Sequence, residues 1–268
     1  TAHPLLAEIG LQNAGLRLKF LKSETSGTAV WGKIFGDIKG QLDAAFNDEE
    51  VIQHKLTAFV VVPKDLTDFG PAWVSAFVSA QIDEAFAVAL EAAFLAGDGN
   101  DKPVGLNRQV QEGVAITGGV YPEKTAQGEL TFADSTVTVK ELTGVYKYHS
   151  TDEKGKSVLV DGLVVMVVNP VDAWDVKAQY TSLNANGVYV TALPFNLTIV
   201  ESVAQKAGTV LTFVKKRYDA YVGGGITLRK YDQTLAIEDL DLYTAKQFAY
   251  GKAKDDKAAA VWTLAIPS

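Results

Sequence analysis

Residues 71–96 read PAWVSAFVSAQIDEAFAVALEAAFLA, and this stretch predicts one long helix. Gly70 and Pro71 suit the cap and the first turn, and Gly97 suits the stop. At about 1.5 Å per residue the helix would be about 39 Å long. Its polar residues follow an i+4 stripe interrupted by Ala87, whereas a surface helix usually needs only one apolar stripe of about 100°. We therefore expect this helix to be covered on more than one side. The polar stripe of this helix consists of Ser75, Ser79, Asp83 and Glu91.

The segments before this helix predict an arm, a hairpin and a strand. Residues 1–15 show little periodicity and are expected to form an extended or partly ordered arm. The stretches LRLKFLK and AVWGKIF alternate apolar and polar residues around a predicted turn at 23–28, which indicates a hairpin with half a hydrophobic face. An isolated hairpin is marginal in water, so this one needs another surface. Residues 56–62 predict a buried strand closed by Pro63.

The segments after the helix alternate between predicted helices and strands and then become mostly β. Residues 134–149 fit a helix capped by Asp134 or Ser135. The stretch VLVDGLVVMVV predicts a hairpin leading into a core strand, and Asn169-Pro170 starts a helix that runs to about Tyr180. Six further strands are expected between about 188 and 266, with a bulge or a close approach of another backbone at the triplet 223–225. Their sequences are GVYVTAL, LTIVES, GTVLTFVKK, DAYVGGGITLRK, LYTAKQFAY and AAVWTLAI.

The composition is that of a folded acidic protein. The 268 residues are 47% hydrophobic and 21% charged, and 25 Lys+Arg against 32 Asp+Glu give a net charge of −7. This balance disfavours tight binding of nucleic acid, which needs clustered cations. The absence of cysteine excludes disulfides and thiolate chemistry. We find no apolar run of about 18 residues and expect no membrane span. The chain starts at Thr1 without Met, which favours a processed form.

The sequence offers few residues for catalysis or metal binding. The three histidines form no metal-ligand pair. The cluster at 98–101 fails as a calcium loop because Lys102 and Gln109 occupy ligand positions. The carboxylate runs 48–50, 238–241 and 255–256, and the basic cluster 215–217, are expected to be solvated. The four tryptophans suggest core and interface anchors. We therefore predict no catalytic, metal or cofactor site and no enzyme activity.

The order of the elements resembles the major capsid proteins of tailed bacteriophages, with the Hong Kong 97-type fold. The most specific residues are the helix end AFLAGDG at 93–99, followed by Pro103 and Gly105-Leu106, and then NPVDAW at 169–174. The resemblance covers nearly the whole chain from about Leu16. It implies an α+β fold with an N-terminal arm, an extended loop hairpin, a peripheral domain with a long spine helix, and an axial domain.

Carried onto this sequence, the resemblance implies five segments. They are an arm at 1–15, an extended loop at 16–55 that reaches over a neighbouring subunit, a peripheral domain at 56–124 with its spine helix at 71–96, an axial domain at 125–220, and peripheral strands at 221–268. Apolar residues on the arm and loop have little obvious core of their own, so we expect them to contact other subunits. These candidates are Leu5, Leu6, Ile9, Trp31, Ile34 and Phe35.

The implied function is a major capsid protein that self-assembles into hexamers and pentamers of an icosahedral phage head around double-stranded DNA. The expected partners are other copies of the chain, a portal, a scaffold, a maturation protease and in some cases a decoration protein, with DNA nearby but not tightly bound. The implied location is the virion, assembled in the bacterial cytoplasm. Some relatives join subunits through a Lys–Asn bond. Lys22, Lys33 and Lys39 offer amines, but no Asn follows Asn196, so no cross-link is expected.

Three other functions stay open at the level of sequence. An encapsulin, a shell with the same fold that encloses a cargo enzyme, is the nearest alternative. A monomeric hydrolase that uses a carboxylate pair is remote, and a tail-tube or other phage structural protein is a further possibility. The contents of purified particles separate a phage head from an encapsulin, and a solitary monomer favours the hydrolase.

Overall fold

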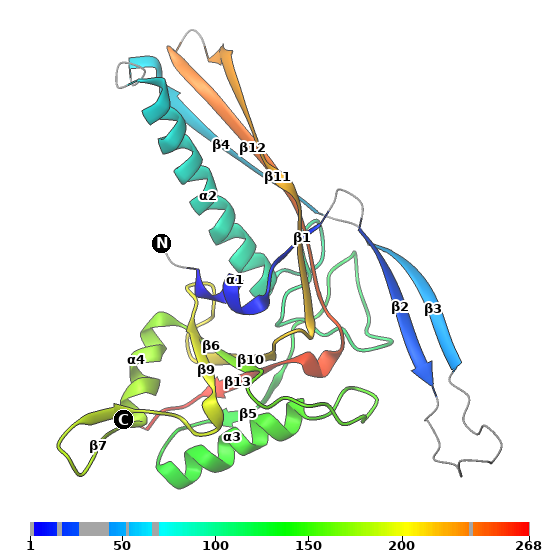
Figure 1. Ribbon diagram of the computed structural model, residues 1–268, viewed down its shortest axis with the longest axis vertical. Helices are drawn as coiled ribbons and strands as arrows, with labels where there is room; N and C mark the ends of the chain where they lie inside the picture. Colours follow the sequence, from blue (N-terminus) through cyan, green and yellow to red (C-terminus); the bar gives the residue numbers. More distant parts are fainter. Residues whose placement is uncertain are drawn as a thin grey trace, which may run out of the picture.

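Two sheets and the long helix α2 carry the fold (Figure 1). The computed structural model describes residues 3–14, 18–26, 43–51, 54–65, 70–235 and 238–267. Its helices are α1 Pro4–Ile9, α2 Pro71–Ala96, α3 Ser135–His149 and α4 Pro170–Gln179. Its strands are β1 Gln12–Ala14, β2 Leu18–Ser26, β3 Asp43–Val51, β4 His54–Pro63, β5 Ala126–Leu130, β6 Val164–Val168, β7 Thr181–Leu183, β8 Tyr189–Thr191, β9 Thr198–Glu201, β10 Thr209–Val214, β11 Tyr218–Leu235, β12 Leu240–Ala253 and β13 Ala259–Leu264.

The first sheet has the order β1-β11-β12-β4, and α2 runs along one of its faces (Figure 1). Burial alternates along β4, because every second side chain points toward the helix. Val62 of β4 and Ala245 of β12 pack there against a stripe of α2 at four-residue spacing. The pairing of β11 with β12 shifts register between Gly223 and Thr227, which confirms the predicted bulge. The stripe consists of Val74, Val78, Ile82 and Phe86.

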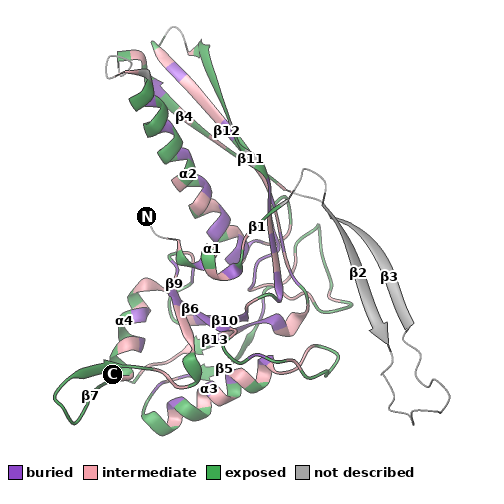
Figure 2. Ribbon diagram, viewed as in Figure 1, coloured by how far each residue is buried: buried purple, intermediate pink, exposed green. Residues whose placement is uncertain are grey.

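Helix α2 begins and ends where the sequence predicts. Most of its length is covered on one side by the first sheet, and only its last turns, with Leu90, Phe94 and Leu95, are also buried against a second group of residues that includes α1. Figure 2 shows the buried stripe and the exposed remainder. By length and composition Ala72–Ala96 is also apolar enough to cross a membrane. The sequence expectation of no span missed this, since Asp83, Glu84 and Glu91 interrupt the run without making it polar. One such helix is weak evidence for a span, and this one packs on β4 and β12.

The second sheet has the order β5-β13-β10-β6-β9, with β6 buried along its whole length. Both predicted helix starts beside it are confirmed. The Asp134 side chain accepts hydrogen bonds from the backbone of Thr136 and Val137 at the start of α3, and Asn169 caps α4 through the backbone of Val171. The expected hairpin before β6 is wrong, because residues 158–163 form a loop and a turn.

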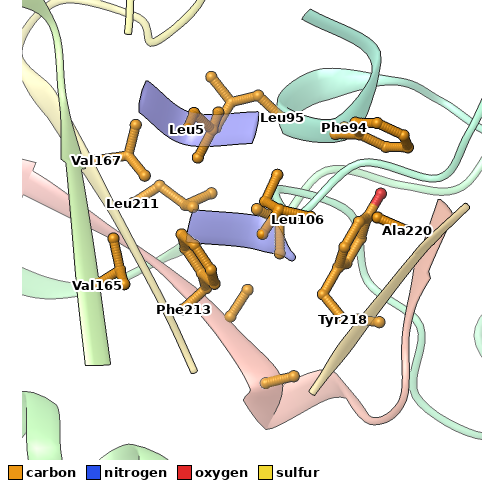
Figure 3. Close-up of a cluster of buried hydrophobic side chains, with 14 of the residues drawn as sticks. Leu5, Phe94, Leu95, Leu106, Val165, Val167, Leu211, Phe213, Tyr218 and Ala220 are labelled. Carbon is orange, nitrogen blue, oxygen red and sulfur yellow. The ribbon is translucent and has the colours of Figure 1, made fainter. Parts of the chain in front are cut away.

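A third cluster of buried side chains joins the two sheets (Figure 3). Helix α1 takes part in it through Leu5 and Ile9, and β1 pairs in parallel with β11. Residues 1–15 were expected to form a loose arm. In the described part of that segment, the short helix instead docks on its own chain, because Leu5 and Ile9 are buried in the cluster that contains Phe94 and Leu211.

The extended hairpin has a different partner strand from the one predicted. β2 continues through Ser26 and pairs with β3 from Leu18↔Val51 to Ser26↔Asp43, so the turn does not lie at 23–28. The run Ser23–Ser26 was interpreted as a turn because it is polar, yet both faces of a projecting ribbon tolerate polar residues. The ribbon extends away from the rest of the molecule in Figure 1. The second predicted strand, AVWGKIF, lies outside the described residues.

All six strands expected after residue 188 are present, but they divide between the sheets. β11 and β12 lie beside β4, whereas β13 pairs with β10 and β5 in the five-stranded sheet. The sequence grouped 221–268 as peripheral strands, whereas β13 lies in a different sheet from β11 and β12. Its buried Ala259, Ala260 and Trp262 fit the centre of that sheet. The five domain boundaries as a whole stay a prediction.

Candidate functional site

The six predicted contact residues lie in two parts of the chain. Leu5 and Ile9 are buried within their own subunit, with 0% and 3% of their surface exposed, and Leu6 is half-buried. The prediction that Leu5 and Ile9 contact a neighbour is therefore wrong, because their side chains belong to the core beside α2. Trp31, Ile34 and Phe35 fall in 27–42, outside the described residues.

The spine surface is an apolar patch on the uncovered side of α2. We define it by Trp73, Phe77 and Val88, which are 47%, 39% and 44% exposed. The rings of Trp73 and Phe77 stack with centroids 5.5 Å apart. Large exposed aromatic residues are typical of the energetic centre of protein interfaces. Trp73 belongs to the tryptophan set that the sequence identified, but the sequence did not separate exposed from buried members.

The sheet surface lies on the other side of β4, β12 and β11, away from α2. It is defined by Phe59, Val61 and Tyr231, which the strand register places in two adjacent rows. Phe59 is 70% exposed. Lys55, Arg229 and Lys246 surround a shallow hollow there together with Phe59 and Tyr231. Among the described residues, no carboxylate forms an ion pair with these three cations. This surface therefore combines apolar area with positive charge in an acidic chain.

A third exposed surface, the hairpin surface, covers α4 and the β7–β8 hairpin. Trp174 is 68% exposed and Tyr189 is 76% exposed, while Trp262 is buried in the second sheet. The Lys177 ammonium lies 4.7 Å from the centroid of the Trp174 ring. Figure 2 shows the hairpin exposed along most of its length. Two of the four tryptophans are thus exposed, one is buried, and Trp31 is not described.

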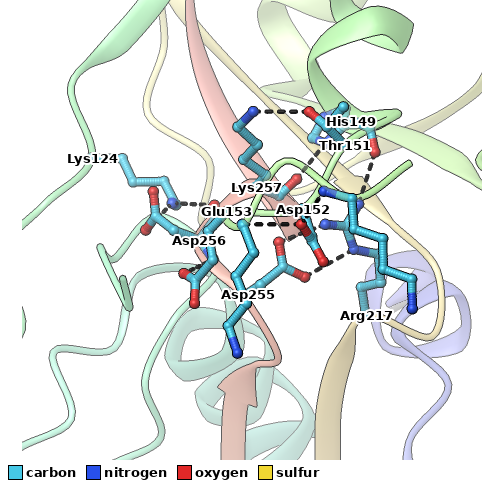
Figure 4. A network of polar contacts seen from close by, with 11 residues as sticks. Lys124, His149, Thr151, Asp152, Glu153, Arg217, Asp255, Asp256 and Lys257 are labelled. Atoms are coloured by element: carbon cyan, nitrogen blue, oxygen red, sulfur yellow. Dashed lines mark hydrogen bonds and ion pairs between the residues drawn. The ribbon is translucent and has the colours of Figure 1, made fainter. Parts of the chain in front are cut away.

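The charged runs near 216 and 255 form a partly buried network and not the solvated face expected from sequence (Figure 4). The Arg217 guanidinium donates to both carboxylate oxygens of Asp255 and to the carbonyl of His149. The Lys124 ammonium lies 2.6 Å from Asp256 Oδ1, and its side chain is only 3% exposed. Sequence reasoning missed this network because no local pattern reports that residues about 130 apart will meet.

His149 sits beneath this network in a fixed tautomer. Its Nδ1 lies 2.8 Å from the Lys257 carbonyl, so Nδ1 carries the proton and donates it. Thr212 Oγ1 then donates to Nε2 over 2.8 Å and accepts from the Trp262 indole, also over 2.8 Å. The pKa of His149 falls from 6.5 to about 4, mainly because the ring is buried; the charges of Arg217 and Lys124 add to the fall, and the bond to the Lys257 carbonyl opposes it. The imidazole is therefore neutral at pH 7.

This burial predicts a loss of stability in acid. The unfolded chain takes up a proton on His149 below pH 6.5 while the folded chain does not. Neutral, buried His149 therefore contributes fully to the free energy of unfolding above pH 6.5. That contribution falls toward pH 4, by at most about 1.4 kcal/mol per pH unit. Urea unfolding between pH 7 and pH 5 should show this slope in the wild type and a shallower one in His149→Asn. Equal slopes would contradict the account.

His3 has the opposite pH dependence and holds α1 in place. Its Nδ1 lies 2.6 Å from the buried Glu91 carboxylate, which also accepts from the Ser202 hydroxyl, and its Nε2 lies 3.4 Å from Glu84. The hydrogen bond to Glu91 raises the pKa of His3 despite partial desolvation. The bond between protonated His3 and Glu91 therefore stabilises the folded chain fully below pH 6.5. This stabilisation is lost as the pH rises through the raised pKa of His3. Glu8 of α1 adds an ion pair with Lys215.

The arrangement offers contact surfaces and little chemistry. Within the described ranges, no group of three or more His, Asp or Glu residues is placed to hold a metal ion. Asp255 and Asp256 each form an ion pair, with Arg217 and Lys124 respectively. The spine, sheet and hairpin surfaces are exposed apolar features of the described residues.

Comparison with known proteins places the chain among shell-forming proteins. The model of the phage capsid family matches residues 6–194. A search of the curated proteins finds no match.

Three solved structures illustrate the similarity of fold. The capsid of a native GTA particle is 17% identical, with a TM-score of 0.63, and the match covers 99% of this chain and 91% of that one. The capsid of Myoviridae phage XM1 is 11% identical, with a TM-score of 0.62 and coverage of 97% and 90%. The holo-SrpI encapsulin complex from Synechococcus elongatus PCC 7942 is 12% identical, with a TM-score of 0.59 and coverage of 98% and 87%.

Proposed function

This chain belongs to the phage capsid family and is a major capsid protein whose copies form an icosahedral shell, and we propose that they assemble as hexamers and pentamers around double-stranded DNA. The observation that carries the proposal is the exposure of three apolar surfaces on a chain whose interior is otherwise well packed. Isolated soluble proteins rarely leave so many large aromatic residues uncovered. Repetition of the subunit in a closed shell covers such surfaces.

The role is structural, and we propose that the chain performs no catalysis. Portal, scaffold, maturation protease and in some cases decoration protein act with it during assembly in the bacterial cytoplasm, and its virion location follows from the family. The net charge of −7 disfavours tight binding of the packaged DNA to the wall. The proposal is tested by negative-stain electron microscopy of purified particles and by analysis of their contents. DNA supports a phage head, and a cargo enzyme supports the encapsulin alternative.

We propose that the β2–β3 ribbon of one subunit lies over the sheet surface of the next. The ribbon projects from the body and pairs only within itself among the described strands. Its strand β3 carries Asp48, Glu49 and Glu50, and the sheet surface offers cations without carboxylate partners among the described residues. Opposite charges steer and orient such a contact.

Charge reversal tests this contact. The double variant Lys55→Glu/Lys246→Glu should fold and lose at least tenfold in shell yield, because it brings like charges together. Adding Glu49→Lys and Glu50→Lys should restore most of the yield. Lys140→Glu, on the exposed side of α3, is the matched control and should assemble as the wild type does. Full assembly of the double variant, or no rescue by the ribbon variants, would contradict this placement.

We also predict that the shell contains no Lys–Asn cross-links. The chain has no Asn after Asn196, so its last strands cannot supply the amide. Mature particles should therefore run as a single band of 28.7 kDa on a denaturing gel. A ladder of covalent oligomers would refute this prediction.

A further inference from the structure

Three segments connect the two sheets in the part of the chain that the structure describes. Residues 97–125 lead from α2 to β5, residues 215–217 lead from β10 to β11, and residues 254–258 lead from β12 to β13. The orientation of one sheet relative to the other depends on how these segments are held. Each contributes at least one charged residue to the same network. We call Lys124, Arg217, Asp255 and Asp256 the corner network.

The corner network ties the three connections to one another. Asp255 of one connection receives two hydrogen bonds from Arg217 of another, and the Lys254 amide donates to the Arg217 carbonyl over 2.9 Å. Asp256 Oδ1 accepts from Lys124 at the end of the third connection and from the Val110 amide within it. Figure 4 shows these side chains meeting at one place from separate elements.

The end of α3 is joined to the same place. The third guanidinium branch of Arg217 donates to the His149 carbonyl over 2.8 Å, and the Lys257 ammonium donates to Thr151 over 2.8 Å. The Asp256 amide lies 3.3 Å from Glu153 Oε2. The second sheet, its helix α3 and all three connections therefore share one set of directional bonds.

Ion pairs that are largely removed from water add little net stability compared with apolar residues of similar size, but their geometry can specify a single arrangement. The side chains of Arg217 and Asp255 are 11% and 14% exposed. A guanidinium that binds both oxygens of a carboxylate fixes direction as well as distance. Apolar contacts in the cluster between the sheets are not directional, and its Tyr218 adds one directional bond, to the Val104 carbonyl.

We propose that the corner network is a positioning device for assembly: it fixes the orientation of the two sheets so that every subunit presents the same contact angles to its neighbours. This rests on the proposed function of the chain as a shell subunit. Loss of the network should not unfold the subunit. It should let subunits adopt a range of orientations, and shells built from them should vary in curvature.

The test is the distribution of particle diameters by electron microscopy. In Arg217→Met/Asp255→Leu both charges are replaced by apolar groups, so the midpoint of urea unfolding should stay near that of the wild type while the spread of diameters at least doubles. Arg217→Lys keeps the charge but loses the two-bond geometry with Asp255, so it should also broaden the distribution of diameters. It provides the test if the double variant does not fold. The control Glu201→Gln removes the ion pair between Glu201 of β9 and Lys177 of α4, which lies outside the three connections, and should leave diameters unchanged.

The outcomes separate this inference from the proposed function. Wild-type diameters in folded Arg217→Lys and double-variant shells would overturn the positioning role and leave the shell function intact. A wild-type protein that forms no shells would contradict the proposed function itself.

Discussion

Replacement of Phe94 by alanine is expected to lower the free energy of unfolding of the subunit by about 3–5 kcal/mol. Phe94 is fully buried in the cluster that joins the two sheets. Its ring meets that of Tyr218 edge to face, with centroids 6.1 Å apart, and the Tyr218 hydroxyl is fixed by a bond to the Val104 carbonyl over 2.7 Å. Gly251 on the other side has no side chain to fill the space. The cavity can therefore collapse only slightly.

The measurement is urea unfolding of the dissociated subunit, with Phe59→Ala as the matched control. Phe59 is a phenylalanine too, on strand β4, but 70% of its surface is exposed. Its loss should change the free energy of unfolding by at most about 0.5 kcal/mol. A loss below about 1 kcal/mol for Phe94→Ala would show that the cluster is not the structural centre of the subunit.

The second large effect is expected at the spine surface. The double variant Trp73→Ser/Phe77→Ser should fold but form no shells. The two rings are partly exposed and stacked on each other, so truncation removes little packing from the core. An interfacial aromatic residue is worth about 2 kcal/mol or more per contact, and every subunit of the shell repeats the contact.

Sedimentation of the assembled fraction measures this effect, and circular dichroism confirms the fold. Trp73→Phe retains an apolar ring and should keep most of the assembly. Shell formation at wild-type levels by the double variant would show that this face of α2 does not contact another subunit.

Local patterns predicted most of the elements. The bounds of α2, the caps at Asp134 and Asn169, and the bulge near Gly223 followed from residues adjacent in sequence. In each case the physical cause is local, namely a periodic apolar stripe, a side chain that reaches a nearby amide, or a glycine without Cβ.

Features that depend on distant pairing could not be predicted in this way. The partner of β2 is β3 rather than a closer segment, and β13 joins the second sheet. Leu5 and Ile9 were assigned to neighbouring subunits because nothing near them in sequence forms a core, whereas they pack under α2. The corner network was missed for the same reason, since Arg217 and Asp255 are 38 residues apart.

Helix α1 docks on its own chain, so the apolar residues of the arm no longer argue for contacts with neighbouring subunits. The three exposed surfaces still do. The spine, sheet and hairpin surfaces are exposed after all described residues are in place. We expect other copies of the chain to cover them.

Analytical ultracentrifugation of the purified wild-type protein at high concentration, followed by electron microscopy of the fastest fraction, tests this most directly. We expect closed shells of uniform diameter. A single stable species of 28.7 kDa, with Trp73, Phe59 and Trp174 still open to solvent, would contradict the assignment of these surfaces to assembly.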